Sequence, residues 1–377
     1  MNAIVPWIDA RRAEAAERFR TLGLPHRRIE NWKYTDLKSA LSGANDSEPG
    51  AIVWSIASVP SGIELFDLAD PENAPDWVKA HLGKAAMAEA MPAASLALAR
   101  TGFALRIPKG ASAAEIVRVG FSGTGHGRAL IVLEEGASLT LVESRAAECG
   151  FSNIGIEIVI GANAHLTHIR SADAAPDAIQ VEDVAIRVAR DASYRAHLVN
   201  GGASLSRLNL RMTLKEPGAN AKLSGVSVLG GKLHADVTTE IYHASRETQS
   251  TQLFKHVAGG QSHVVYQGKI IVAEGADKSD SRQTAKALLL GERAEADLKP
   301  ELEIFADDVK CAHGAAVGDL DADSLFYLRA RGIPEVEARN MLIRAFLEEA
   351  VAEIADDGIR EAVWASVESA LPGAMAS

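Results

Sequence analysis

The pattern of apolar positions changes twice along the chain and divides it into three parts. Near the N-terminus, "DARRAEAAERFRTLGL" places Ala15, Phe19 and Leu22 at near-helical spacing before a glycine and a proline end the segment. The alanine-rich stretch "KAAMAEAMPAASLALA" predicts further helix, and the turn-forming run "SGANDSEPG" between the two predicts a linker. We therefore expect an N-terminal helical region over residues 1–100.

The middle of the chain has short apolar strands that alternate with turns. From residue 101 to residue 318, glycine, asparagine or aspartate separates the strands. A unit of strand, small or acidic turn, alanine and second strand recurs in "LIVLEEGASLTLVE", "IEIVIGANAHLTHI", "VAIRVARDASYRAHLV" and "LRMTLKEPGANAKLSGV". Its turn alanines are spaced 25, 30 and 27 residues apart, at Ala137, Ala162, Ala192 and Ala219.

Stacked coils explain this repeat better than a meander, because each coil of a solenoid turns its corner above the same corner of the coil below. A degenerate fifth copy in "FKHVAGGQSHVVYQG" and a sixth around Ala294 extend the repeat. We therefore predict a mainly β fold, a β-helix or a related stacked-sheet solenoid, with its core over residues 101–318. A β-sandwich with variable loops is the alternative. The lack of long helical segments in this region argues against a doubly wound α/β sheet.

The last part, residues 319–377, is expected to form a C-terminal helical domain. In "DADSLFYLRARG", Asp321 or Asp323 is a suitable N-cap and Gly332 a suitable C-terminal stop. Pro334 then suits the first turn of the next helix, "PEVEARNMLIRAFLEEAVAEI".

The apolar surface of that helix is wider than one packing face needs. One stripe consists of Val336, Ile343, Leu347, Ala350 and Ile354. Four more residues broaden it: Met341, Leu342, Ala345 and Phe346. Two interpretations are open, namely that the helix is buried in a three-helix unit, or that part of it docks a partner protein.

Composition narrows the classes of function. A chain of 377 residues predicts two or three structural units or an elongated repeat fold, and no apolar run suggests a membrane span. The net charge of -11 argues against nucleic-acid binding, and 5% aromatic residues are few for a carbohydrate groove. Two cysteines cannot form a disulfide framework, and the first residues do not follow the order of a secretory signal. A cytoplasmic protein with small-molecule or protein partners is therefore expected.

One cysteine stands two residues from a histidine, in "DDVKCAHGAA". On a strand, residues i and i+2 point to the same face, so Cys311 and His313 are expected to project together. Thiolate and imidazole suit zinc and iron-sulfur chemistry, but a closed tetrahedral site needs about four donors. The pair is therefore either a structural thiol beside a hydrogen-bonded histidine, or part of a metal site that another segment or chain completes.

Other candidate sites are weaker. His165 and His168 are three residues apart, which places them on opposite faces of a strand, and Cys149 lies in a predicted turn. Asp307 and Asp308 fit a solvated corner. Four further histidines have no ligand spacing and are read as ordinary sheet or surface residues: His234, His243, His256 and His263. No phosphate loop, Gly-x-Ser-x-Gly elbow or His-Glu-x-x-His helix is present, so residue spacing predicts no enzyme.

Two stretches carry a resemblance to a known family. "RRIENWKYTDLKSAL" and "KPELEIFADDVKCAHGAAVGDLDADSLFYLRARGI" resemble the SufB/SufD family of the SUF iron-sulfur cluster assembly system. The SufD branch matches better, because "RQTAKALLLGERAEADLKP" lacks the upstream cysteine of SufB and "ADDVKCAHGA" lacks its Glu-His-Glu type of sequence. A SufB-like cluster scaffold remains the alternative within the family.

The resemblance implies a fold, partners and a role. It implies a right-handed parallel β-helix that pairs with the β-helix of SufB, and a C-terminal helical domain that docks the ATPase SufC. The chain would then be a non-catalytic scaffold, with a transient iron-sulfur cluster or iron at the SufB–SufD interface and none in the isolated chain.

Candidate site residues follow from the same resemblance. His313 is the preferred ligand of the nascent cluster, together with a SufB cysteine, and Cys311 is the second candidate. "CAHGAA" differs from the commoner "CSHGAT" by two hydroxyls, but it keeps both residues. The candidate residues for SufC docking are Met341, Leu342, Phe346 and Leu347.

Two functions of other classes stay open. A β-helix enzyme that acts on polysaccharide would line a groove with carboxylates and aromatic rings, and five tryptophans offer little for it. A structural homodimer would form if the isolated chain paired with itself through an exposed sheet edge.

Overall fold

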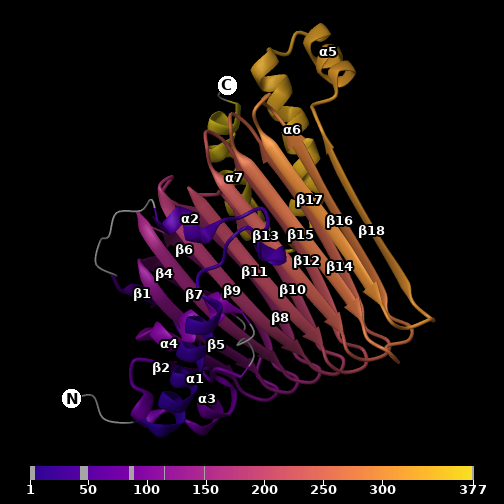
Figure 1. Ribbon diagram of the computed structural model, residues 1–377. Helices are drawn as coiled ribbons and strands as arrows, with labels where there is room; N and C mark the ends of the chain where they lie inside the picture. The colour runs from indigo at the N-terminus through magenta and orange to yellow at the C-terminus, as the bar shows by residue number, and fades with distance from the viewer. Residues whose placement is uncertain (1–4, 43–49, 85–88, 114, 148, 376–377) are drawn as a thin grey trace.

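The computed structural model describes residues 5–42, 50–84, 89–113, 115–147 and 149–375, and its body is a coiled ribbon of strands (Figure 1). From β3 onward, each coil contributes one strand to each of two sheets. Sheet A contains, in spatial order, β1(Ile52–Ile56), β4(Val117–Gly123), β6(Ser138–Ala147), β8(His165–Ala174), β10(Ser193–Asn200), β12(Asn220–Leu229), β14(Gln249–Ala258), β16(Asp280–Leu289) and β18(Lys310–Gly318). Sheet B contains β2(Glu64–Asp67), β3(Thr101–Ile107), β5(Gly125–Leu133), β7(Gly150–Ile160), β9(Ala178–Val188), β11(Leu205–Leu214), β13(His234–His243), β15(His263–Val272) and β17(Glu295–Ile304).

The strand pairing is that of a solenoid. From β3 onward, neighbouring strands of a sheet run parallel and are two places apart along the chain, as β10 is with both β8 and β12. A sandwich of hairpins would instead pair consecutive strands antiparallel. The predicted β-helix is therefore confirmed, and the β-sandwich is excluded for the described residues.

The repeat arises at the corner where the chain passes from sheet B to sheet A. In four successive coils, the residue just before the sheet A strand is an alanine at most 1% exposed: Ala137, Ala164, Ala192 and Ala219. The strand register places them in one column, spaced 27, 28 and 27 residues apart. The prediction of Ala162 was wrong, because the corner position belongs to Ala164 and Ala162 is only half-buried. A small side chain suits this fully buried position between the two sheets.

The later copies of the repeat were also misplaced. The alanine column continues with Thr248 and Ser279, the residues that precede β14 and β16. The copies predicted within residues 254–268 and around Ala294 lie instead where the chain returns from sheet A to sheet B. Glycine-rich turns occur at both corners, so the turn pattern alone did not distinguish them.

Helices flank the solenoid at both ends of the chain. The N-terminal ones are α1(Pro6–Leu22), η1(Glu30–Trp32), α2(Leu37–Ser42), η2(Pro71–Asn73), α3(Asp76–His81) and α4(Ala90–Leu98). The C-terminal ones are α5(Ala322–Ala330), α6(Glu335–Val351) and α7(Asp357–Met375). Among the described residues, no helix combines the length and apolar character that a membrane crossing requires. The predicted linker "SGANDSEPG" lies almost entirely outside the described residues.

Two strands that the helical pattern did not predict close the first coil. β1 pairs antiparallel with β4, and β2 pairs antiparallel with β3. Ile52 of β1 is 2% exposed, and the ring of Trp54 lies 5.5 Å from that of Phe103. The N-terminal segment thus fills the interior at this end of the solenoid with apolar side chains.

The stretch "IENWKYTD" fixes the N-terminal segment on the outer face of sheet B. Trp32 is buried, and the guanidinium of Arg207 lies 4.0 Å from the centre of its ring. Arg207 also pairs with Asp236 and donates a hydrogen bond of 2.6 Å to the backbone oxygen of Asn31. Thr35 donates to the same Asp236 carboxylate at 2.5 Å. This buried cluster explains why the motif combines a tryptophan with a threonine three residues later.

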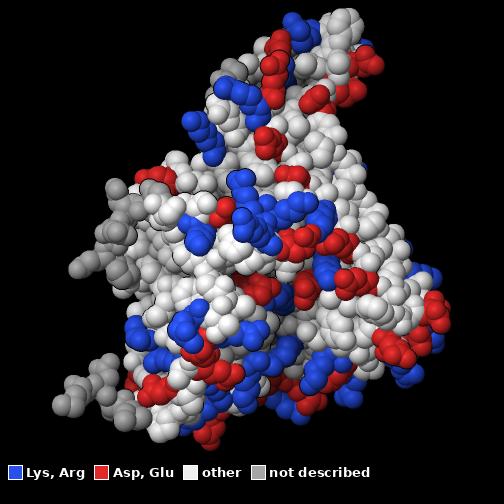
Figure 2. Space-filling view, viewed as in Figure 1, with Lys and Arg blue, Asp and Glu red and all other residues white. Residues whose placement is uncertain are grey.

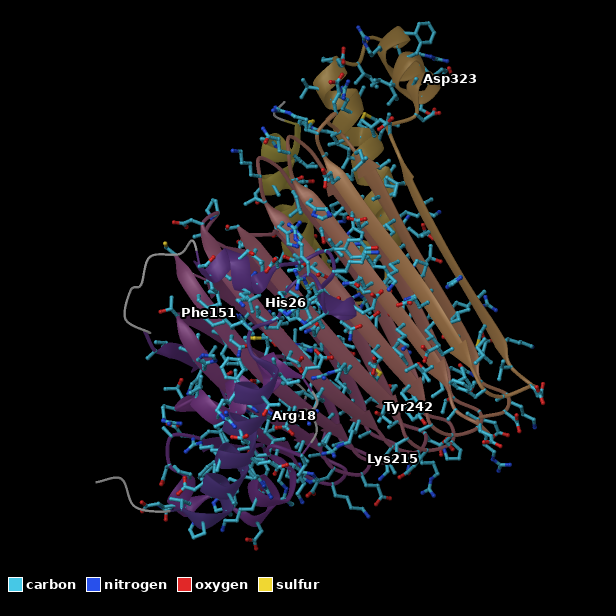
Figure 3. All side chains as sticks on the ribbon, viewed as in Figure 1. Arg18, His26, Phe151, Lys215, Tyr242 and Asp323 are labelled. Carbon is cyan, nitrogen blue, oxygen red and sulfur yellow. The ribbon has the colours of Figure 1, made fainter. Side chains whose placement is uncertain are left out.

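The C-terminal helices α6 and α7 cover the outer face of sheet A. Ile343, Leu347 and Ala350 of α6 pack with Val226 and Val257 of the sheet. The interpretation that this helix is buried in a three-helix unit is thus confirmed only in part, because α6 packs on sheet A as well as on α7. α5 has no buried residue, and Figure 3 shows its Asp323 beyond the sheets.

The predicted start of α5 is confirmed at Asp321. Its carboxylate accepts a hydrogen bond of 2.7 Å from the backbone N–H of Ser324. Gly332 follows the end of the helix with a φ of 88°, a conformation that favours glycine.

Replacing Arg207 with leucine should lower the free energy of unfolding by about 3–5 kcal/mol, because Asp236 would remain buried without its cation. Denaturant unfolding followed by circular dichroism measures this loss. Arg282→Leu, at a side chain 72% exposed, is the control and should change stability by less than about 0.5 kcal/mol.

The double variant Arg207→Leu/Asp236→Leu removes both charges and should be more stable than Arg207→Leu alone. A double variant that is less stable would show that the ion pair is not the source of the loss.

Candidate functional site at the open end of the solenoid

The last coil leaves one end of the solenoid uncovered. β18 ends sheet A and β17 ends sheet B, so each has a strand neighbour on one side only (Figure 1). Val317 of β18 is 48% exposed and Ile304 of β17 is 41% exposed. The flank of the molecule along β18 carries few charged side chains (Figure 2). We call the exposed surface of β17 and β18 the open end.

Cys311 and His313 both lie on the inward side of β18. The register pairs Cys311 with Ser281 and His313 with Gln283, and these two β16 residues are at most 1% exposed. Because paired neighbours in a sheet point to the same side, both β18 residues face the solenoid axis. The predicted common face is thus observed, with Cys311 half-buried and His313 exposed.

Cys311 lies in an apolar corner of the last coil, beside Ile270, Val272 and Ala276. Burial, followed by the negative charge of Asp280, raises the pKa of the Cys311 thiol. The thiol is therefore mainly protonated at neutral pH, and a metal would have to displace its proton in order to bind.

A chain of hydroxyl groups lies behind Cys311. His243 Nε2 is 2.9 Å from Ser250 Oγ, and Ser250 Oγ is 2.6 Å from Ser281 Oγ, next to Cys311 in the register. Burial lowers the pKa of His243 to about 4, so this histidine is neutral near pH 7. The chain thus consists of neutral groups, which hold β13, β14 and β16 together.

A second buried polar chain ends next to His313. Thr239 donates to Gln252 Oε1 at 2.7 Å, Tyr266 donates to the same oxygen at 3.2 Å, and Gln283 Nε2 donates to Tyr266 at 2.8 Å. Among the described residues Gln283 Oε1 has no hydrogen-bond partner. A buried unsatisfied acceptor costs about 1–3 kcal/mol. Sequence analysis missed this chain.

The two donors of the open end are not joined by others. Among the described residues, no group of three or more His, Cys, Asp or Glu side chains is arranged to hold a metal ion. Cys311 and His313 therefore form an incomplete ligand set in the single chain. The choice between a structural thiol and a shared metal site depends on what covers the open end.

The remaining histidines lie apart from this site. His165 is exposed and contacts Ser193 Oγ at 2.8 Å, whereas His168 is buried against Glu143 and Tyr194, so the two face opposite sides as expected. His234 and His263 are neighbours at the start of β13 and β15, with their rings 4.9 Å apart in an edge-to-face arrangement. Burial lowers the pKa of His256 to about 4. Asp307 and Asp308 lie in the exposed corner before β18, and Cys149 is exposed between β6 and β7.

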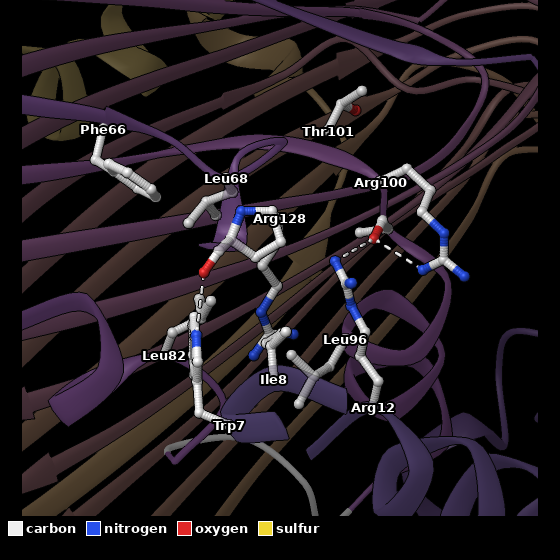
Figure 4. A pocket seen from close by; sticks show the side chains of 12 residues that line it. Trp7, Ile8, Arg12, Phe66, Leu68, Leu82, Leu96, Arg100, Thr101 and Arg128 are labelled. Atoms are coloured by element: carbon white, nitrogen blue, oxygen red, sulfur yellow. Dashed lines mark hydrogen bonds between the residues drawn. The ribbon is translucent and has the colours of Figure 1, made fainter. Parts of the chain in front are cut away.

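A small pocket lies in the N-terminal region, and the hydrogen bonds around it hold α1 in place (Figure 4). Apolar residues of α1, β2 and α4, such as Ile8 and Leu96, line it. Trp7 donates to the backbone oxygen of Pro71 at 3.1 Å, and Arg12 donates to that of Ala99 at 3.2 Å. These bonds tie α1 to the neighbouring loops.

The helix residues expected to dock a partner differ in exposure. Met341 is 45% exposed, and Leu342 and Phe346 are half-buried. Leu347 is completely buried against sheet A, so it is not available to a partner in this arrangement. The exposed apolar residues nearby lie instead on α5 and at the start of α6: Phe326 at 75%, Tyr327 at 57% and Val336 at 62%.

Comparison with known proteins gives consistent results along the whole chain. The SufBD core domain family of SUF system FeS cluster assembly matches residues 118–346, and the SufBD protein N-terminal region matches residues 2–46. The iron-sulfur cluster assembly protein SufD of Escherichia coli is 30% identical, over 99% of this chain and 97% of its own length.

Two further relatives have related descriptions. An iron-sulfur cluster assembly SufBD family protein of Synechocystis is 36% identical over 60% of this chain and 52% of its own length. A SufBD family protein of Mycobacterium tuberculosis is 26% identical over 92% of this chain and 89% of its own length.

Alkylation of Cys311 by iodoacetamide, in a Cys149→Ser background, should have a pH midpoint above that of an ordinary thiol. The raised pKa leaves less thiolate at a given pH, so the folded chain reacts more slowly. Asp280→Asn removes a like charge and should move the midpoint to lower pH. Unfolding in urea should restore the ordinary midpoint, and identical midpoints in the folded and unfolded chain would contradict the assigned environment.

Proposed function

Since the chain belongs to the SufBD family of the SUF iron-sulfur cluster assembly system, we propose that it is a non-catalytic scaffold subunit that shares a cluster-assembly site with a second solenoid. The partner would be a SufB-type chain that covers the open end. The iron or nascent cluster is the cargo of this site.

The observation that carries the proposal is the incomplete ligand set on an exposed strand. Cys311 and His313 face inward on β18, and no further coil within the described residues covers them. The free backbone groups of an edge strand can pair with a strand of another chain. Such pairing would bring the partner's side chains next to His313 and could supply the missing donors.

The two candidate ligands have different surroundings. His313 is exposed, and a neutral imidazole nitrogen can bind iron without first crossing an apolar layer. Cys311 is half-buried and its thiol pKa is raised, which disfavours the thiolate. We therefore assign the ligand role to His313 and a mainly packing role to Cys311.

The α5–α6 region is the proposed docking site for a SufC-type ATPase. Phe326, Tyr327, Val336 and Met341 are exposed apolar residues of α5 and α6. Figure 1 shows that α5 and the start of α6 extend beyond the solenoid. The Nζ atom of Lys255 lies over the ring of Phe346, 4.5 Å from its centre, and pairs with Glu349 at 2.7 Å. Force applied to α6 would thus act on β14, two strands from β18.

His313→Ala should abolish or strongly reduce cluster assembly while the complex still forms. The test is anaerobic assembly by the chain co-expressed with SufB and SufC, followed by absorbance and iron content. Cys311→Ala should retain most of the activity, because a packing role tolerates a small side chain.

His165→Ala is the matched control, since His165 is an exposed histidine of the same sheet and its Nδ1 lies 2.8 Å from Ser193 Oγ. Assembly by His313→Ala at the wild-type rate would refute the ligand role. Purification of the co-expressed chain as a homodimer without SufB would argue for self-pairing through the open end.

Val336→Asp combined with Met341→Asp should weaken binding of SufC at least about tenfold, because charges would replace the centre of an apolar contact. Isothermal titration of the purified chain with SufC measures the affinity. Val53→Asp, on the distant strand β1 with the side chain 58% exposed, controls for a general effect of added charge. Unchanged affinity in the double variant would exclude this surface.

A further inference from the structure

The buried chain that ends at Gln283 has a defined direction. Gln252 Oε1 accepts from both Thr239 and Tyr266, so the single phenolic proton of Tyr266 is used. With the Gln252 amide in this orientation, Tyr266 accepts from Gln283 through Nε2 at 2.8 Å. The amide orientation of Gln283 follows, and its Oε1 is left as a free acceptor in a residue only 1% exposed.

The interior is shaped to hold this amide. Gly268 of β15 lies where a Cβ atom would approach Gln283 Nε2 to 1.5 Å and the Tyr266 hydroxyl to 2.7 Å. Any other side chain at this position would displace the amide. The Gln283 side chain thus reaches across the interior from sheet A to sheet B, in a space that a glycine leaves open.

His313 is the next residue in the same column. The register runs from Gln252 to Gln283 to His313 across β14, β16 and β18. Parallel strands lie about 4.8 Å apart, so neighbouring side chains in a column are within hydrogen-bond reach. A histidine ring N–H is the donor that the free Gln283 Oε1 lacks.

Among the described residues Gln283 Oε1 has no partner, and a rotation of the exposed His313 side chain would bring a ring N–H to it. We propose that Gln283 is a positioning residue for His313, accepting this hydrogen bond from one ring nitrogen through Oε1. This bond places the proton on the nitrogen that faces the interior. The other nitrogen keeps its lone pair and points out of the open end. A ligand histidine is commonly oriented by a second hydrogen bond of this kind.

The hydrogen bond itself does not depend on the proposed function, whereas its use in cluster assembly rests on that proposal. In the isolated chain Gln283 sets the tautomer of His313. In the assembled complex the same bond would hold the metal-binding nitrogen toward the partner chain. The first level, the hydrogen bond in the isolated chain, and the second level, its use in cluster assembly, can be tested separately.

Nitrogen NMR of the full chain labelled with ring-¹⁵N histidine tests the first level. His313→Ala identifies the His313 signals among the 11 histidines. At a pH where the ring is neutral, wild type should show one dominant tautomer, and Gln283→Leu should show a mixture of both. Gln283→Glu keeps an acceptor oxygen and should restore the single tautomer.

Thr239→Val is the matched control. It replaces a buried polar group at the far end of the same chain of bonds and leaves Gln283 in place, so the His313 tautomer should not change. Circular dichroism and thermal unfolding confirm that each variant is folded. Identical His313 spectra in wild type and Gln283→Leu would overturn the proposal, as would failure of Gln283→Glu to restore the tautomer.

Cluster assembly in the complex tests the second level. Gln283→Leu should slow assembly about tenfold or more without changing complex formation, and Gln283→Glu should recover most of the rate. If the tautomer responds to Gln283 but His313→Ala assembles clusters normally, the proposed function fails and the hydrogen bond stands. If His313→Ala blocks assembly but the His313 tautomer is the same in wild type and Gln283→Leu, the positioning role fails and the proposed function stands.

Discussion

Hydrogen bonding between successive coils is the constraint on which the rest of the molecule depends. Each parallel strand satisfies its backbone groups only through the coil before it and the coil after it. At each end of the solenoid, the outermost strand therefore has backbone N–H and C=O groups without a neighbouring coil. The two ends differ, with antiparallel N-terminal strands at one and an exposed β18 at the other. The candidate ligands lie at the exposed end.

The interior of the solenoid is more polar than a core built for packing alone would be. Glu182 is buried and pairs with two buried arginines, Arg145 and Arg170. In the later coils, from β13 to β16, a neutral chain joins Thr239, Gln252, Tyr266 and Gln283. Removing one member of such a network is costly because its neighbours stay desolvated. Buried polar groups also fix the register, since a shifted strand would leave them unpaired. The neutral chain that stabilises these coils ends at Gln283, next to His313 in the register, and so it also affects the geometry of the open end.

The sequence predicted the solenoid because the corner chemistry repeats, and it predicted the common face of Cys311 and His313 because strand alternation is regular. It misplaced one corner alanine, since "GANA" offers Ala162 and Ala164 and only packing distinguishes them. It missed the Gln283 chain because that network joins residues from four strands. The signal in the sequence was two glutamines at inward positions, Gln252 and Gln283, which share a column. The burial of Leu347 could not be predicted, because a helix stripe does not tell whether a sheet or a partner covers it.

The antiparallel strands β1 and β2 also limit how many chains can join through their β-sheet edges. They are short, and Ile52 and Trp54 fill the coil interior behind them, which makes that end a poor template for another chain. Only the β17–β18 end then offers long parallel edges. Pairing through a single end joins two molecules and stops there, so these edges favour a closed pair over an open-ended filament. A chain that exposes candidate ligand side chains on a sheet edge is thereby protected against polymerisation.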